Sequence, residues 1–159
     1  MSDGTIFDRE VDLLIFGSGA GGLSAGIFAD KSGLDTLICE KSLVIGGTTA
    51  TSGGVVWIPN SDQAKAAGID DSLGKARTYM AEELGNYYRA DLVDAYLESG
   101  PRALADLENG TEIKFDLMTW SDYHPDKPGA IGMGRSLSIR ASDGLLLGAY
   151  FQRTRVPIK

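Results

Sequence analysis

The chain has 159 residues, of which 43% are hydrophobic, so it can build a core and is not disordered by composition. Its formal charge of −7 and the lack of a basic cluster argue against a nucleic-acid-binding surface. No apolar run reaches the roughly 18 residues needed to cross a bilayer, and the N-terminus lacks the features of a signal peptide. We therefore expect a soluble cytoplasmic protein without a membrane span.

The N-terminal quarter carries the clearest pattern. Residues 11–16 are nearly all apolar, as in a parallel strand covered on both faces. A G-x-G-x-x-G turn follows at residues 17–22, then a small-residue helix over about 20–31 and an apolar strand over 36–40. The acid that ends this strand, Glu40, lies 40 − 22 = 18 residues after the last glycine, near the spacing of about 20 typical of a ribose-binding carboxylate. The order predicts a dinucleotide site on an α/β fold.

Each part of this motif has a physical role. Gly17 permits the tight turn, Gly19 lets a phosphate approach the backbone, and Gly22 lets the helix lie close to the strand. The positive end of the helix suits a pyrophosphate. Glu40 is expected to accept ribose hydroxyls and to repel a 2′-phosphate; the alternative, a solvated acid at a strand end, is less favoured.

A second glycine-rich segment, residues 46–54, follows the acidic strand and contains two Gly-Gly pairs around hydroxyl side chains. Such a segment can present backbone N–H groups to an extended ligand. A flexible surface loop is the alternative, but residues 55–58 are too apolar for that. A simple NAD-binding unit does not need this segment.

The glycine turn, the Glu40-Lys41 pair and residues 46–60 together resemble the FAD-binding flavoprotein family that includes fumarate reductase flavoprotein subunits and 3-ketosteroid dehydrogenases, with the ketosteroid branch closest. The resemblance implies a Rossmann-like FAD-binding domain with a parallel sheet, incomplete here, and an added helical segment. No metal site is expected. The residues that it assigns to FAD are Gly17, Ser18, Gly19, Ala20, Gly21 and Gly22 at the pyrophosphate, Glu40 at the ribose, Lys41 and Ser42 at the adenosine half, and Gly47, Thr48, Thr49, Ser52, Gly53 and Gly54 along the pyrophosphate and toward the flavin.

The remaining chain is expected to be mostly scaffold. Its periodicity predicts a helix over 70–83 and another over 90–98, a third beginning at Pro101, and a strand over 111–117. The sole cysteine, Cys39, is expected to be a buried, inert thiol. The tyrosines of this region are expected to be packing residues: Tyr79, Tyr87, Tyr88 and Tyr96.

The aromatic and proline-rich loop 119–130 holds the only histidine, His124, beside Tyr123. A histidine suits acid–base chemistry near neutral pH, although loop hydrogen bonds alone would also explain it. Ketosteroid 1-dehydrogenases have a similar segment with two tyrosines before a proline, the second of them in the active site. Tyr123 matches the first and His124 stands at the second, so both are candidate catalytic residues. Arg135 is expected to form a structural salt bridge rather than meet a substrate.

The resemblance implies an FAD-dependent oxidoreductase acting on a carbon–carbon bond next to a carbonyl, with a small-molecule substrate such as a steroid-like or other apolar ketone. Residues 1–159 read as the N-terminal part of the FAD-binding domain, with the substrate-side region beginning at about 119. The family's proteins are much longer, so we expect this chain alone to bind FAD weakly and to be inactive. The alternatives are an inactive nucleotide-binding remnant and, less favoured, an NAD-linked dehydrogenase.

Overall fold

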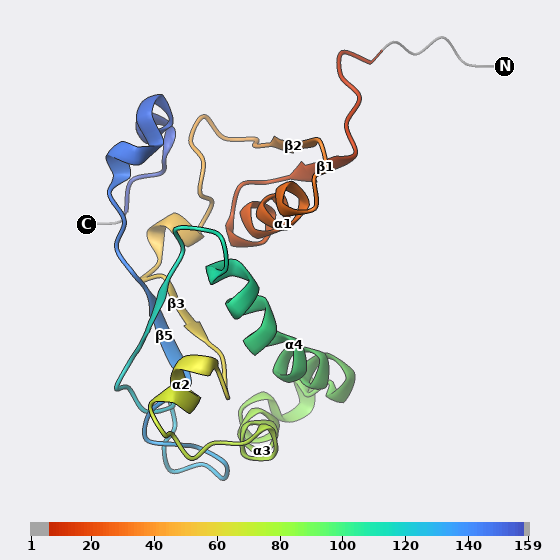
Figure 1. Cartoon of the computed structure of the whole chain (residues 1–159). Coiled ribbons are helices and arrows are strands. Elements are labelled where there is room, and N and C mark those ends of the chain that lie inside the picture. Colours follow the sequence, from red (N-terminus) through yellow and green to blue (C-terminus); the bar gives the residue numbers. More distant parts are fainter. Residues whose placement is uncertain (1–6, 158–159) are drawn as a thin grey trace, which may run out of the picture. The chain divides into compact units, whose positions relative to one another are not determined.

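The computed structural model describes residues 7–157 and divides into two compact units (Figure 1). The first unit consists of residues 7–52 and 144–157, and the second of residues 53–143. The second unit therefore interrupts the first in sequence. Within the described range, no helix combines the length and the apolar character that crossing a membrane would require.

The first unit opens with a βαβ arrangement of β1 (Leu13–Phe16), α1 (Ala20–Lys31) and β2 (Thr36–Cys39). The strands are parallel, with Leu13 opposite Thr36 and Phe16 opposite Cys39. Glycine lets α1 pack against them: a Cβ on Gly22 would lie 1.9 Å from the carbonyl oxygen of Gly17. The α/β fold class predicted from the glycine turn is confirmed.

The first unit contains two further pieces, a short 3₁₀ turn η1 (Thr49–Thr51) and the irregular segment η3 (Gly144–Arg153). A parallel bridge between Ile45 and Thr154 joins the chain before η1 to the chain after η3. Cys39 at the end of β2 is exposed, so the expectation of a buried thiol was wrong. Cys39 ends β2, which lies at the edge of a sheet that consists of β1 and β2 among the residues described.

The second unit contains an antiparallel sheet that the sequence did not predict. Its strands are β3 (Val55–Trp57), β4 (Phe115–Leu117) and β5 (Ser136–Ile139), in the order β3-β5-β4. The predicted strand over 111–117 is thus real but short. One hydrophobic cluster joins Phe115 of β4 and Leu137 of β5 to Ile58 and Leu104.

Helices complete the second unit: α2 (Asp62–Ala66), α3 (Leu73–Leu84), the 3₁₀ turn η2 (Gly85–Tyr87) and α4 (Ala90–Glu108). α3 agrees with the predicted helix and is capped by Ser72, whose hydroxyl accepts a hydrogen bond from the N–H of Lys75.

The prediction of separate helices on either side of Pro101 was wrong, because α4 runs through the proline. Leu97 and Leu104, which are 1% and 5% exposed, anchor the two halves of α4 in the core. Their burial compensates for the hydrogen bond that proline removes.

The tyrosines divide between packing and surface positions. Tyr79 is 5% exposed, with its ring beside that of Trp57, and Tyr88 packs against the cluster of Ala76, Val93 and Leu97. Both act as packing residues, as expected.

Tyr87 is 87% exposed, so its expected packing role was wrong. It lies in η2, a turn between two helices, where its side chain faces solvent. Tyr96 is 41% exposed and donates a hydrogen bond to the carbonyl oxygen of Trp57.

Candidate functional site

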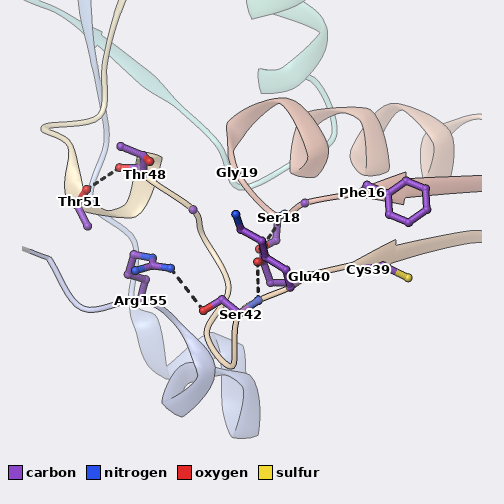
Figure 2. Close-up of a pocket in the computed structure, with 12 residues that line it drawn as sticks. Phe16, Ser18, Gly19, Cys39, Glu40, Ser42, Thr48, Thr51 and Arg155 are labelled. Atoms are coloured by element: carbon purple, nitrogen blue, oxygen red, sulfur yellow. Dashed lines mark hydrogen bonds between the residues drawn. The ribbon is translucent and has the colours of Figure 1, made fainter.

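A pocket of about 850 Å³ opens in the first unit at the carboxyl ends of β1 and β2 (Figure 2). Ligands of open α/β sheets bind at this end of the strands. Its lining comes from the glycine turn, the end of β2 and the chain that follows, and the segment after η3: Phe16, Gly17, Ser18, Gly19, Cys39, Glu40, Lys41, Ser42, Gly47, Thr48, Thr51 and Arg155.

Glu40 is held in the pocket by the protein itself. The side-chain and backbone donors of Ser18 lie 2.6 and 2.9 Å from Oε2, and the N–H of Ser42 lies 2.9 Å from Oε1. The Ser18 hydroxyl, the Ser18 N–H and the Ser42 N–H, in that order, lower the pKa of Glu40 to about 2. Glu40 is therefore a fixed carboxylate at neutral pH. A carboxylate offers about four acceptor positions, and these donors together with the Lys41 backbone occupy most of them.

The two glycine-rich segments meet directly. The N–H of Gly46 donates to the Ser18 hydroxyl at 3.1 Å, and the N–H of Ala20 donates to Oγ1 of Thr49 at 3.1 Å. Gly47 has a φ of 55°, and a Cβ there would lie 3.0 Å from Cα of Gly19. A side chain at this position would push the segments apart, so glycine is needed to bring them into one wall.

The structure gathers only part of the predicted set around the pocket. Eight predicted cofactor residues line it: Gly17, Ser18, Gly19, Glu40, Lys41, Ser42, Gly47 and Thr48. Five others belong to the same unit without lining the pocket: Ala20, Gly21, Gly22, Thr49 and Ser52. Gly53 and Gly54 open the second unit.

The sequence did not point to four of the lining residues, Phe16, Cys39, Thr51 and Arg155. Phe16 and Cys39 could have been found, because each directly precedes a recognised residue at the end of a parallel strand. Arg155 carried no signal, since its place depends on the bridge between Ile45 and Thr154.

The candidate catalytic residues belong to the second unit. Nδ1 of His124 lies 2.6 Å from Oε1 of Glu83, and the His124 N–H donates to the Tyr79 hydroxyl at 3.2 Å. Lys127 forms an ion pair with Glu83 at 3.2 Å. Burial raises the pKa of Glu83, but hydrogen bonds from His124, Tyr79 and Lys127 outweigh it and lower that pKa overall. Tyr123 is 96% exposed.

A buried ion network fixes the start of this loop. Arg135 is 1% exposed and binds Asp71 through Nε and Nη2, at 2.9 and 2.7 Å, and Asp122 through Nη1 at 2.8 Å. Asp122 also accepts hydrogen bonds from the Trp57 ring and the Ile131 N–H. Arg135 thus forms the structural salt bridge expected of it, and Asp122 places the following residue, Tyr123.

Comparison with known proteins gives the family. Residues 12–144, well over half of the chain, match the family model described as an FAD binding domain. The chain belongs to this family. FAD-binding domains hold FAD as their cofactor, so the dinucleotide predicted from the glycine turn is FAD.

Two relatives and a solved structure illustrate what this FAD-binding domain resembles. It is 39% identical over 145 residues to the 3-oxosteroid 1-dehydrogenase of Mycobacterium tuberculosis (strain ATCC 25618 / H37Rv), covering 89% of this chain and 25% of that protein. It is 36% identical over 138 residues to the 4-oxocyclohex-2-ene-1-carboxylate 5-dehydrogenase of Sinomonas cyclohexanicum, covering 86% and 23%.

The crystal structure of 3-ketosteroid delta1-dehydrogenase from Sterolibacterium denitrificans, in complex with 1,4-androstadiene-3,17-dione, superposes with a TM-score of 0.86 and 36% identity. The superposition covers 93% of this chain and 26% of the Sterolibacterium denitrificans chain. The FAD-binding domain described here therefore spans about a quarter of the length of the proteins it matches.

The pocket residues fit the adenosine diphosphate part of FAD. The first-turn amides of α1 lack intrahelical partners, and only that of Ala20 is taken by Thr49 among the residues described, so the helix end suits an anion. Glu40 is a charged carboxylate at the end of β2, the position from which a ribose hydroxyl is bound in such folds. Nε of Arg155 is buried and has no hydrogen-bond partner among residues 7–157, as expected for a donor that a ligand satisfies.

Proposed function

We propose that the complete protein is an FAD-dependent oxidoreductase that dehydrogenates a carbon–carbon bond next to a carbonyl. The observation that carries this proposal is the pocket of the first unit, where the glycine turn, the charged Glu40 and the Gly47–Thr48 wall meet. The similarity to proteins named 3-oxosteroid 1-dehydrogenase and 4-oxocyclohex-2-ene-1-carboxylate 5-dehydrogenase supports a cyclic ketone as substrate. A ring ketone, either steroid-like or a smaller ring that carries a carboxylate, fits both names.

The chemistry removes two hydrogens from neighbouring carbons. A base takes a proton from the carbon next to the carbonyl, whose oxygen stabilises the resulting charge. Bound FAD supplies the acceptor for the hydride that leaves the second carbon, and a carbon–carbon double bond forms. This chain contributes the pocket that holds and orients the cofactor's adenosine side.

His124 is the residue of this chain that we propose for proton transfer, with Tyr123 beside it. Its Nδ1 is engaged by Glu83 at 2.6 Å, which leaves Nε2 as the nitrogen that exchanges a proton. A carboxylate that orients an imidazole in this way is a recurring device in acid–base catalysis. We propose that the loop carrying both residues, from about residue 119, begins the substrate-side region.

Two measurements on the purified complete protein, including its substrate domain, test the function. The visible absorption spectrum separates a flavin from a nicotinamide enzyme, and turnover with an artificial electron acceptor tests ring ketones of different sizes. We expect a flavin spectrum and conversion of a 3-oxo steroid or a 4-oxocyclohexane carboxylate to the unsaturated ketone. A protein without flavin that reduces NAD would contradict the proposal, and flavin binding without any ketone turnover would favour the inactive remnant.

The role of His124 is tested in the protein that contains the substrate domain. Replacement by Phe should lower kcat about 10²-fold or more, the range expected for general acid–base catalysis. Replacement by Tyr, the residue at this position in ketosteroid 1-dehydrogenases, should retain activity and move the pH profile upward, because a phenol titrates near 10. Unchanged turnover in the Phe variant would reduce His124 to a loop residue.

The chain alone is expected to bind FAD weakly and to be inactive, because it holds the adenosine side of the site and spans a quarter of the relatives' length. A stoichiometric flavin in the purified 159-residue chain would contradict this.

A further inference from the structure

Arg155 stands out among the arginines of residues 7–157. Three of them are not fully exposed: Arg77, Arg135 and Arg155. Arg77 pairs with Asp94 at 2.6 Å, and Arg135 binds two buried aspartates. Arg155 forms no ion pair with any residue in that range, and the one side-chain hydrogen bond that it makes there is long, 3.5 Å from Nη2 to the Ser42 hydroxyl.

The Arg155 guanidinium also has a buried hydrogen-bond donor without an acceptor among the residues described. Its Nε is the one buried side-chain nitrogen or oxygen, among the residues described, that lacks a hydrogen-bond partner. A buried donor without an acceptor is unfavourable, and more so on a charged group. Native structures keep such a group where a ligand satisfies it.

The main chain holds Arg155 in place. Its N–H donates to the carbonyl oxygen of Ile45 at 2.8 Å, and the Ile45 N–H donates to the carbonyl oxygen of Arg153 at 2.7 Å. Ile45 directly precedes the glycines that meet the Gly17–Gly22 turn. Figure 2 shows the guanidinium reaching from the segment after η3 toward Ser42 at the pocket. The charge is therefore fixed at the pocket by the same segment that builds its wall.

We propose that Arg155 recognises the pyrophosphate of FAD and is an anion-binding residue of this site. Guanidinium groups bind phosphate oxygens through paired, charge-assisted hydrogen bonds. The phosphates are the anionic groups of FAD, and the pocket's own carboxylate, Glu40, is already held by Ser18 and Ser42. This inference rests on the proposed function, since it takes the pocket as the cofactor site.

The test compares adenosine, ADP and inorganic pyrophosphate as probes. In a nuclear magnetic resonance titration, the Nε–H signal of Arg155 should shift with ADP and with pyrophosphate, but not with adenosine. Amide signals of Ser18 and Ser42 should shift with adenosine and ADP. Arg155→Met should weaken ADP binding about 10- to 100-fold, as expected for charge-assisted hydrogen bonds, and leave adenosine binding unchanged.

The control is Arg153→Met, which removes the same charge two residues away from an exposed position. It should weaken ADP binding less than about twofold, as expected for a screened surface charge. Arg155→Lys should recover only part of the affinity, because lysine lacks the planar fork. Without ligand, Arg155→Met should be as stable as the unaltered protein, since an unpaired buried donor is removed.

The outcomes separate this inference from the function. If ADP and adenosine bind equally well and Arg155→Met weakens neither, the pocket binds the nucleoside and Arg155 has no anion role. Equal weakening by the Arg153 and Arg155 variants would reduce the effect to general charge and overturn the inference. If neither adenosine nor ADP shifts the Ser18 and Ser42 amides, both the inference and the cofactor site fail.

Discussion

Gly22 offers a sharp test of how the βαβ arrangement is held together. A Cβ on this residue would lie 1.9 Å from the carbonyl oxygen of Gly17 and 3.0 Å from its carbonyl carbon. Both atoms belong to the backbone and cannot rotate away. Since an ordinary contact is 3.4 Å or longer, Gly22→Ala requires the first turn of α1 to move by about 3.4 − 1.9 = 1.5 Å.

The expected magnitude follows from two opposing effects. Overpacking of this kind costs about 1–3 kcal/mol, and the rigid backbone places Gly22 near the upper end. Alanine in a helix gains about 1 kcal/mol over glycine. The net destabilisation is therefore about 2 kcal/mol. Gly21→Ala is the matched control, because nothing lies within 4 Å of its Cβ, and it should stabilise α1 by about 0.5–1 kcal/mol.

Amide hydrogen exchange in α1 is the suitable assay. Both tryptophans, Trp57 and Trp120, lie in the second unit, so fluorescence would report on the wrong part of the chain. We expect α1 amides to exchange faster in Gly22→Ala and slower in Gly21→Ala, a difference of about 3 kcal/mol in opening free energy. Equal protection in the two variants would refute the close packing of helix on turn.

Three further predictions concern the carboxylates. Since folding lowers the pKa of Glu40 from 4.5 to about 2, its contribution to stability is present above pH 4.5 and is lost as the pH falls toward 2. In urea unfolding, Glu40→Gln should be less stable at neutral pH, and its unfolding free energy should fall less steeply between pH 4.5 and pH 2. An unchanged fall over that pH range would contradict this. Glu83→Ala removes the acceptor for His124, so exchange of the His124 amide should speed up, and unchanged exchange would mean that Glu83 does not hold the loop. Asp122→Ala leaves Arg135 with one of its two buried partners and should cost about 3–5 kcal/mol in urea unfolding; a cost under about 1 kcal/mol would show that the pair is not a structural anchor.

The part of the fold that could be predicted is the part determined by residues close together in the sequence. The glycine turn, the apolar runs beside it and Glu40 fix β1, α1 and β2 through contacts within about 30 residues. The helix predicted over 70–83 agrees with α3 (Leu73–Leu84) because helical periodicity and the capping of helix ends are also local. Their agreement with the structure reflects short-range physics.

The second sheet was missed because its signal is spread along the chain. β3, β4 and β5 are only three or four residues long, too short to show an alternating pattern, and β3 pairs with β5 about 80 residues later. Pro101 misled for a related reason: proline is a local signal for a break, whereas the burial of Leu97 and Leu104 that keeps α4 continuous is a tertiary effect.

The candidate site likewise contains residues that local sequence signals identify and residues that depend on long-range contacts. Glu40 was recognisable from its spacing, but its capture by Ser18 depends on how the turn folds back over the strand end. The loop of His124 could be recognised as ordered, whereas its tie to Glu83 joins residues 41 positions apart. Arg155 could not be found by any local rule.

The bridge between Ile45 and Thr154 has a consequence for synthesis. Its partners lie 154 − 45 = 109 residues apart, with the whole second unit between them. At about 5–20 residues per second, a ribosome needs roughly 5–20 s to deliver the second partner after the first. During that interval the nascent chain has its glycine turn but not Arg155, so the pocket gains this lining residue only after the inserted unit has been made.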